Sequence, residues 1–134
     1  MDNDKLKLSS QITFLYYREL EPVDAFYREV MGLELVQDQQ WAKIYRVSEK
    51  AFIGIVAGER GFHRVREENA VVLTFVVDDV RAWYAHLERS GATLLTEIKE
   101  VEDIDVRGFF LKDPGGYVLE VQRFLAPDAE RIFG

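Results

Sequence analysis

Glu120 is a carboxylate in the middle of a predicted strand, between Leu119 and Val121. Apolar neighbours on both sides predict burial, and a buried carboxylate needs a cation, hydrogen-bond donors or a raised pKa, because an unpaired buried charge is costly. We weigh four roles for it: a structural ion pair with Arg107 or Lys43, ligand recognition, metal binding, and general-base catalysis with a pKa brought near the working pH by burial.

The turn before Glu120 determines which residues face it. Asp-Pro-Gly-Gly at residues 113–116 is typical of a tight turn, so residues 106–112 and 117–124 should form a hairpin. Pairing Lys112 with Tyr117 sets Phe109 opposite Glu120, and facing residues of an antiparallel pair share a sheet face. One face is then expected to carry Arg107, Phe109, Leu111, Val118, Glu120 and Gln122, and the other, packed on a helix, Phe110, Tyr117, Leu119 and Val121.

Strand parity predicts an aromatic wall elsewhere in the chain. Residues 71–77 alternate so that Val72, Thr74 and Val76 point away from a helix. Residues 41–47 and 52–57 should form a second hairpin around a four-residue loop, with Val47 opposite Phe52 and with Ala42, Ile44, Ala51, Ile53 and Ile55 facing a helix. The wall facing away from the helices would contain Ile12, Phe14, Tyr16, Trp41, Lys43, Tyr45, Phe52, Gly54 and Val56.

The predicted elements occur twice in the same order. A strand at residues 12–17 precedes a helix that begins near Pro22 and ends at Gly32; a strand at 71–77 precedes a helix capped near Asp79 and ending at Gly91. The two glycines are 59 residues apart, which indicates a duplication. We predict an α+β fold of tandem β-α-β-β-β modules, with an extension over residues 1–10, modules over 11–57 and 71–124, a linker over 58–70 and a tail over 125–134.

This arrangement resembles the vicinal oxygen chelate superfamily, which groups glyoxalase I, extradiol dioxygenases, methylmalonyl-CoA epimerase, fosfomycin-resistance transferases and bleomycin-binding proteins. The resemblance rests on Ala-Phe-Tyr-Arg-Glu-Val-Met-Gly-Leu-Glu-Leu at residues 25–35, Val-Val-Asp-Asp-Val at 76–80 and Asp-Pro-Gly-Gly-Tyr-Val-Leu-Glu at 113–120. It implies a curved mixed sheet around a cleft, helices on the convex side, and frequent dimerisation.

The resemblance also implies four metal-ligand positions, which fall on Ile12, Gly54, Val72 and Glu120. Only Glu120 can bind a metal, and one carboxylate is too few for the three protein ligands of a usual catalytic site. We therefore expect no metal and no other cofactor. The expected function is metal-independent binding of a small aromatic or amphiphilic molecule, including a cationic one, since ring faces and Glu120 suit such a ligand.

The candidate ligand contacts are the polar and aromatic residues of the predicted cleft and one linker histidine. They are Phe14, Tyr16, Trp41, Lys43, Tyr45, Phe52, Gly54, Thr74, Arg107, Phe109, Glu120, Gln122 and His63. The aromatic residues among them could equally be packing only, and His63 could be a solvated linker residue. The alternative function is a lyase, isomerase or dioxygenase with a displaced metal site, or with Glu120 as general base.

Composition and net charge exclude several classes of protein and of binding partner. A hydrophobic content of 48% fits a globular chain, and the absence of cysteine excludes disulfides and thiolate chemistry. The net charge of -7 argues against nucleic-acid binding, which requires clustered Lys and Arg. No apolar run reaches the roughly 18 residues of a membrane span, and the charged start has no signal core behind it. We expect a cytoplasmic homodimer that binds a small molecule, without nucleic-acid or membrane partners.

Overall fold

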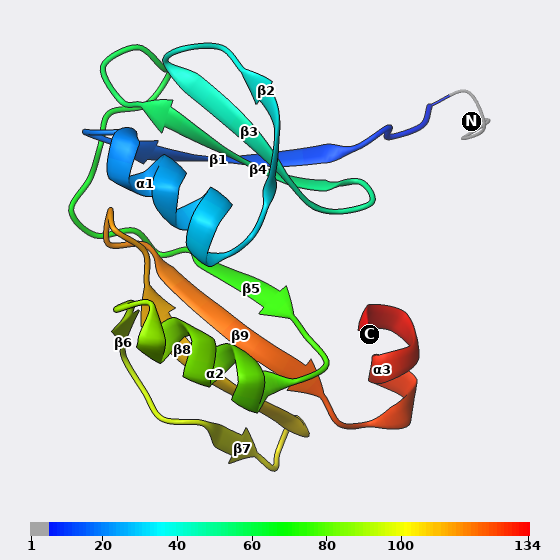
Figure 1. Ribbon diagram of the computed structural model, residues 1–134. Helices are drawn as coiled ribbons and strands as arrows, with labels where there is room; N and C mark the ends of the chain where they lie inside the picture. The colour runs from blue at the N-terminus through cyan, green and yellow to red at the C-terminus, as the bar shows by residue number, and fades with distance from the viewer. Residues whose placement is uncertain (1–5) are drawn as a thin grey trace. The chain divides into compact units, whose positions relative to one another are not determined.

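A computed structural model describes residues 6–134, so the predicted extension over residues 1–10 lies partly outside the described residues. The chain divides into two compact units, one ending at Arg66 and the other beginning at Glu67. Each unit contains a mixed sheet and a helix that follows its first strand (Figure 1). This confirms the α+β fold of two β-α-β-β-β modules.

The first unit consists of β1 (Gln11–Tyr17), α1 (Glu21–Ala25), a π-helical turn η2 (Phe26–Val30), β2 (Glu34–Asp38), β3 (Ala42–Ser48) and β4 (Ala51–Ala57). The strand order is β1-β4-β3-β2. β1 runs parallel to β4, and the other neighbours are antiparallel. The connection from β1 to β4 therefore passes through the helix and the β2–β3 hairpin, as a parallel neighbour requires.

The helical segment of the first unit follows the predicted pattern. Pro22 lies in its first turn, where the missing N–H costs nothing, and Gly32 follows its end with a φ of 74°, a backbone conformation that glycine adopts without a steric penalty. Val23 and Tyr27 are fully buried. The Tyr27 ring lies 6.0 Å from the Tyr45 ring of β3, so the helix covers one face of this sheet.

The second unit consists of β5 (Val72–Val76), α2 (Val80–Arg89), β6 (Thr93–Leu94), β7 (Lys99–Val101), β8 (Val106–Lys112), β9 (Val118–Phe124) and α3 (Pro127–Phe133). Its strand order is β5-β9-β8-β6, and β7 also pairs with β8. Residues 93–101 contain two short strands, β6 and β7, with an irregular segment between them. In that segment, the Leu95 amide donates to Phe110 O, and Thr96 Oγ1 accepts from the Phe110 amide, so a side chain interrupts the ladder.

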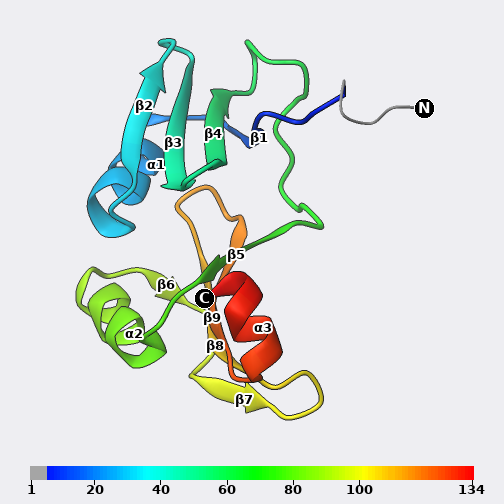
Figure 2. The same cartoon turned by 90° about the vertical axis from the view of Figure 1, so that its right-hand side faces the viewer.

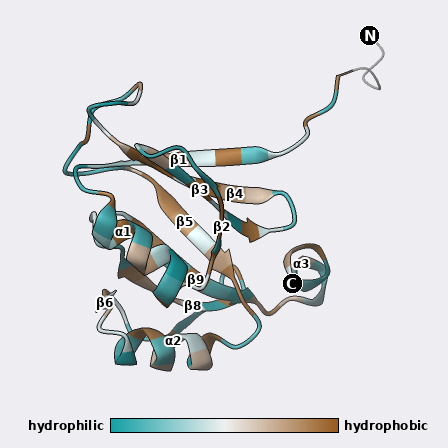
Figure 3. Ribbon diagram, turned by 45° about the horizontal axis from the view of Figure 1, so that its top comes forward, coloured by the Kyte–Doolittle hydropathy of each residue, from teal (hydrophilic) through white to brown (hydrophobic). Residues whose placement is uncertain are grey.

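α2 is amphipathic and covers one face of the second sheet. The Asp79 side chain caps it by accepting a hydrogen bond from the Ala82 amide, and Gly91 follows its end with a φ of 77°. Leu87 is fully buried, and the Tyr84 ring contacts the Phe109 ring edge-on at 5.0 Å. Figure 3 shows hydrophobic residues along β5 and hydrophilic residues recurring along α2.

The predicted C-terminal tail contains the short helix α3, which lies beside β9 (Figure 2). The Phe133 ring stacks on Phe124 with ring centroids 4.6 Å apart, and Arg123 forms an ion pair with Glu130 at 3.5 Å. These contacts attach the end of the chain to the sheet. Among residues 6–134, no helix is long and apolar enough to span a membrane.

The register predicted for the last hairpin is wrong by one residue. Lys112 pairs with Val118 rather than Tyr117, so Phe110 lies opposite Glu120 and Phe109 opposite Val121. The cause is a five-residue connection in place of the expected four. Asp113 Oδ1 accepts hydrogen bonds from the amides of Gly115 and Tyr117, and the Asp113 amide bonds Tyr117 O, which closes the longer loop.

The register predicted for the β3–β4 hairpin is also wrong. Ser48 pairs with Ala51, and a β-bulge separates this pair from the next, Arg46 with Phe52. A bulge adds one residue to one strand and exchanges the faces of every residue beyond it. Tyr45 therefore lies opposite Ile53 instead of Gly54, and the whole of β3 is turned over relative to the prediction.

Candidate ligand-binding faces

Each sheet has one face covered by its helix and one turned away from it, which we call the open face. On the open face of the second sheet, Thr74 Oγ1 donates a hydrogen bond to Glu120 Oε1 at 2.8 Å, across the parallel β5–β9 pair. Val72 and Val76 flank Thr74 on the same face and are 50% and 37% exposed. Glu120 is therefore half-buried, and two exposed valines lie on the neighbouring strand of the same face.

Glu120 does not form the structural ion pair considered from the sequence. Arg107 bonds both of its guanidinium nitrogens Nε and Nη2 to Glu100 Oε1, at 2.9 and 2.7 Å, on the face covered by α2. Lys43 bonds Asp38 at 2.8 Å in the first unit. Within residues 6–134, no Lys or Arg forms an ion pair with Glu120, so its partner in the protein is a neutral hydroxyl.

The one-residue change in register alters which of the predicted ligand contacts share the open face of this sheet with Glu120. Phe109 is 1% exposed and packs under α2, so its predicted place beside Glu120 is wrong, as is that of Arg107. Gln122 does share the open face with Glu120 and is buried. Phe110, which the sequence assigned to the helix side, is instead the aromatic residue opposite Glu120. Only the turn geometry at Asp113 could have revealed it.

The open face of the first sheet contains the predicted aromatic residues of β1 and β4. Ile12, Phe14 and Tyr16 pair with Phe52, Gly54 and Val56, and paired residues share a face. Phe14 is 41% exposed and its ring lies over Gly54. A Cβ at position 54 would lie 2.4 Å from two Phe14 ring carbons, so glycine is what allows the ring to lie flat on the strand.

Arg46 is a cation on this open face that sequence reasoning missed. Its guanidinium lies over the Phe52 ring, 5.0 Å from the centroid, and it donates hydrogen bonds to Glu49 O at 2.7 Å and Glu34 Oε1 at 3.3 Å. Stacking and two hydrogen bonds fix the orientation of this planar group. The bulge at the β3–β4 hairpin places Arg46 on the open face. The spacing of residues in the sequence does not predict that bulge.

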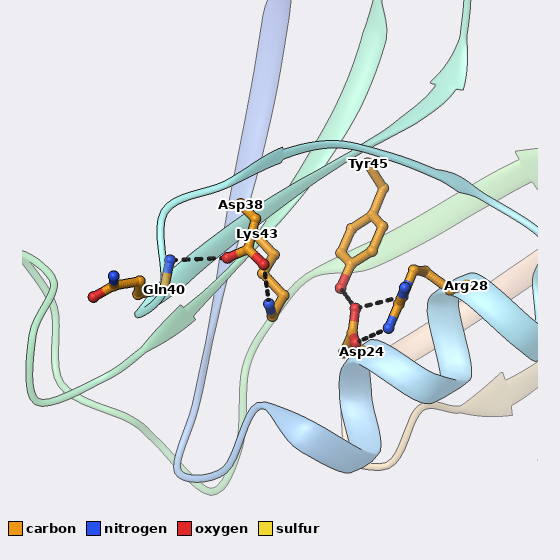
Figure 4. Close-up of polar contacts among 6 residues, drawn as sticks. All are labelled: Asp24, Arg28, Asp38, Gln40, Lys43 and Tyr45. Carbon is orange, nitrogen blue, oxygen red and sulfur yellow. Dashed lines mark hydrogen bonds and ion pairs between the residues drawn. The ribbon is translucent and has the colours of Figure 1, made fainter.

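Tyr45 and Lys43 lie on the helix side of the first sheet, so their assignment to the open wall is wrong. The Tyr45 hydroxyl donates to Asp24 Oδ1 at 2.5 Å, and the Arg28 guanidinium donates to both Asp24 oxygens at 3.0 and 2.6 Å (Figure 4). Lys43 bonds Asp38, whose Oδ1 also accepts the Gln40 amide. The cluster ties the helix to β3 and serves stability.

The electrostatics of this cluster follow from burial and hydrogen bonding. Burial alone would raise the pKa of the Asp24 carboxyl, but the hydrogen bonds from Tyr45 and Arg28 outweigh burial and lower the pKa below its ordinary value. Burial, followed by the hydrogen bond to Asp24, raises the pKa of Tyr45 far above its ordinary value. Asp24 is therefore ionised and Tyr45 neutral throughout the physiological range.

Trp41 and His63 lie at the edges of the first unit. Trp41 precedes β3, is 38% exposed and contacts the Arg60 guanidinium at 5.7 Å from the ring centroid. His63 is exposed in the segment after β4, and its ring contacts the Tyr16 ring edge-on at 5.4 Å. His63 thus reaches the end of the open face, while Trp41 is occupied by a cation of its own chain.

The four positions that the resemblance relates to a metal do lie on open faces. Ile12 and Gly54 are on that of the first sheet, and Val72 and Glu120 on that of the second. The donor set does not fit a divalent ion, because three of the four side chains offer no oxygen or nitrogen. The described part of the chain contains no group of three His, Asp or Glu residues placed to bind a metal ion.

Comparison with known proteins identifies the same fold elsewhere. A family model described as the glyoxalase/bleomycin resistance protein/dioxygenase superfamily matches residues 11–121. A search of curated proteins gives no match. Among solved structures, a lactoylglutathione lyase from Agrobacterium tumefaciens is 20% identical, with a TM-score of 0.71, over 88% of this chain and 95% of that one.

Two further structures show a likeness of the same order. The fosfomycin resistance protein FosX from Listeria monocytogenes is 12% identical, with a TM-score of 0.73, over 93% of this chain and 99% of that one. A glyoxalase/bleomycin resistance protein/dioxygenase from Nocardioides is 14% identical, with a TM-score of 0.72, over 93% and 91%. At these identities the likeness establishes the fold.

Proposed function

The chain belongs to the glyoxalase/bleomycin resistance protein/dioxygenase superfamily, and on that premise we propose that it binds a small aromatic or amphiphilic molecule without a metal. The observation that carries the proposal is the Glu120–Thr74 pair on an accessible strand face between exposed valines. Such a mixture of apolar surface with a few fixed polar groups is typical of small-molecule sites.

The open faces suggest what the ligand offers. Glu120 has no cation of its own among the described residues, so a positively charged or hydrogen-bond-donating group of a ligand would complete its hydrogen bonding. On the open face of the second sheet, Phe110 lies opposite Glu120 and offers a ring for stacking. The open face of the first sheet, taken by itself, presents the exposed Phe14 ring. An aromatic molecule with a basic or donor group is the ligand class that these features support.

A test should measure ligand and metal binding separately. Thermal shift with a set of aromatic amines reports ligand binding, because a ligand at 100 times its Kd adds about 2.7 kcal/mol to stability. Glu120→Gln should remove the response to the amines, whereas Glu100→Gln, a carboxylate change on the other face of the same sheet, should leave it intact. A library that stabilises neither the wild type nor the control would refute the proposal.

Native mass spectrometry of protein purified without chelator tests the absence of a metal directly. We expect a mass equal to the polypeptide, with or without an organic adduct. One divalent ion per subunit in the wild type, lost in Glu120→Gln, would support the alternative of a lyase, isomerase or dioxygenase with displaced ligands. The superfamily fold is shared with a lactoylglutathione lyase, which makes this alternative worth measuring.

A metal-free enzyme is the second alternative, with Glu120 as general base. The favouring observation is that Glu120 is accessible and its Oε1 is oriented by the Thr74 hydroxyl, as a base needs to be. Turnover of a candidate substrate that Glu120→Gln abolishes, while Glu120→Asp retains part of it, would support catalysis. Tight binding with no turnover would support the binding protein.

The assembly and location that we propose are a homodimer in the cytoplasm, without nucleic-acid or membrane partners. Exposed apolar residues on both open faces and a net charge of -7 support association with a copy or a small molecule rather than with nucleic acid. Light scattering after size exclusion should give twice the mass of 15.6 kDa. A monomer across the micromolar range would overturn the dimer.

A further inference from the structure

The first unit contains a cavity that the proposed ligand faces do not use. It has a volume of about 320 Å³ and is lined by Arg18, Gly58, Glu59, Arg64 and Val65. Arg18 directly follows β1, and the other four residues belong to the segment after β4, which we call the return loop (residues 58–66). The volume lies at the lower end of the range typical of small-molecule sites.

The return loop is attached to the sheet at several points. The Gly58 amide donates to Tyr17 O at 3.0 Å, and the Arg60 amide donates to Ala57 O at 2.8 Å. Val65 folds back on Gly58 so closely that a Cβ there would lie 2.3 Å from Val65 Cγ2. One side of the cavity is therefore formed by a turn in which Val65 packs on Gly58.

Gly61 is a second point at which the return loop packs against the sheet. A Cβ at this position would lie 2.7 Å from Tyr16 Cε2 and 2.7 Å from Val56 Cγ1, so the loop backbone rests on the end of the sheet. His63 contacts Tyr16 from the same loop. Together with the Gly58–Val65 contact, these interactions hold the loop backbone on either side of Arg64.

The charge of the cavity is unusual for this chain. The return loop has three arginines and one glutamate, a formal charge of +2, in a protein whose net charge is -7. Two of the five lining residues are arginines, against the single carboxylate of Glu59. Within residues 6–134, Arg64 forms no ion pair, so its guanidinium is available to a ligand.

We propose that this cavity binds a small oxyanion that also carries a hydrogen-bond donor. The planar guanidinium of Arg64 matches a carboxylate or phosphate group through paired N–H donors, and the charge of Arg18 adds to the attraction. Glu59 repels a fully deprotonated anion but accepts a hydrogen bond from an acidic or alcoholic O–H. The favoured class is a protonated phosphate, a phosphate monoester or a hydroxy acid.

Comparing the affinities for phosphate and sulfate distinguishes this site from a surface that attracts any anion by its positive charge. At pH 6.5 inorganic phosphate retains a proton that it can donate to Glu59, whereas sulfate has the same tetrahedral shape and no proton. Titration calorimetry at constant ionic strength should give saturable phosphate binding at least tenfold tighter than sulfate binding. Glu59→Gln should reduce this preference below threefold, because the amide also offers a donor to sulfate.

The control for Arg64 is Arg60, which lies in the same loop, stacks on Trp41 and does not line the cavity. Arg64→Gln should weaken phosphate binding at least tenfold, and Arg60→Gln, with the same change in charge, less than twofold. Both variants should unfold within a few degrees of the wild type. Equal losses in the two variants, or heats linear in phosphate concentration, would overturn the proposal.

The result of the phosphate-binding experiment does not depend on the proposed function of the open faces. Thermal shift with aromatic amines should be unchanged in Arg64→Gln, because the lining residues of the cavity do not include the open-face residues Glu120 and Thr74. Loss of the amine response together with phosphate binding would contradict separate sites.

Discussion

Thr74 Oγ1 lies 2.8 Å from Glu120 Oε1, and the two residues pair directly across the parallel strands β5 and β9. A hydroxyl is a neutral donor, so this contact orients the carboxylate without neutralising its charge. The other carboxylate oxygen and the remaining lone pairs stay available to water or to a ligand. A side chain that only stabilised the sheet would gain more from the kind of arginine pairing that Glu100 has on the opposite face.

Removing the hydroxyl should therefore affect binding more than folding. Thr74→Val keeps the β-branched shape and should change the free energy of unfolding by less than about 1 kcal/mol, because an exposed hydrogen bond contributes little net stability. We expect the affinity for an amine ligand to fall two- to tenfold, as Glu120 loses its fixed orientation. Chemical denaturation and a ligand titration on the same samples measure both quantities. A large loss of stability with unchanged affinity would contradict this role.

Gly54 and Phe14 should be energetically coupled. Gly54→Ala places a methyl group 2.4 Å from the Phe14 ring and should destabilise the protein by about 1–3 kcal/mol through overpacking. In the Phe14→Ala background the same substitution should cost less, since the obstructing ring is gone. A double-mutant cycle by urea denaturation gives the coupling energy. Additive costs would show that the ring can move aside freely.

The sequence allowed the helices and the parity of β1 and β5 to be predicted, because each is encoded by neighbouring residues. Pro22, Asp79, Gly32 and Gly91 mark helix ends whatever the rest of the chain does. The open-face positions of Phe14 and Thr74 follow from alternation within a single strand. These parts of the fold and of the candidate site need no knowledge of strand pairing.

The two hairpin registers could not be predicted because each depends on one local detail of backbone geometry. A bulge next to Ser48 turned over Tyr45 and brought Arg46 to the open face. One extra loop residue, stabilised by the Asp113 carboxylate, moved Phe109 away from Glu120 and Phe110 toward it. Because side chains alternate between the two faces of a sheet, a register error of one residue moves every residue of the strand to the opposite predicted face.

The Asp24–Tyr45 pair predicts a characteristic dependence of stability on pH. Asp24 has a lowered pKa in the folded protein, so its contribution is fully present above the ordinary pKa of about 3.9 and is lost as the pH falls through the folded value. Tyr45 has a raised pKa, so its contribution is present below about pH 10 and is lost as the pH rises beyond it.

Tyr45→Phe tests the acid limb of this curve. It should cost about 1–3 kcal/mol at pH 7, because a buried carboxylate loses a hydrogen-bond donor. The loss of stability between pH 5 and 2 should become shallower, since the folded pKa of Asp24 moves up toward its unfolded value. Tyr117→Phe is a control with the same chemical change in the other unit. Parallel pH curves for Tyr45→Phe and the wild type would refute the coupling.

The loop at Asp113 offers the sharpest test of why the last hairpin has its register. Asp113 is 4% exposed, and its Oδ1 accepts the amides of Gly115 and Tyr117 at 3.0 and 2.9 Å. Asp113→Ala leaves these donors without that acceptor and should destabilise the protein by about 2–4 kcal/mol, one to two for each lost bond. Asp113→Asn retains an acceptor oxygen and should cost less than half as much.

Amide hydrogen exchange separates loss of the turn from a general loss of stability. In Asp113→Ala, protection should fall first at Gly115 and Tyr117 and along β9 near Glu120, because the five-residue connection no longer closes. If the chain then adopted the four-residue connection, Lys112 would pair with Tyr117 and Phe109 would move opposite Glu120. Cross-strand nuclear Overhauser contacts distinguish the two registers. Native contacts between Phe110 and Glu120 in a stable Asp113→Ala variant would show that other interactions fix the register.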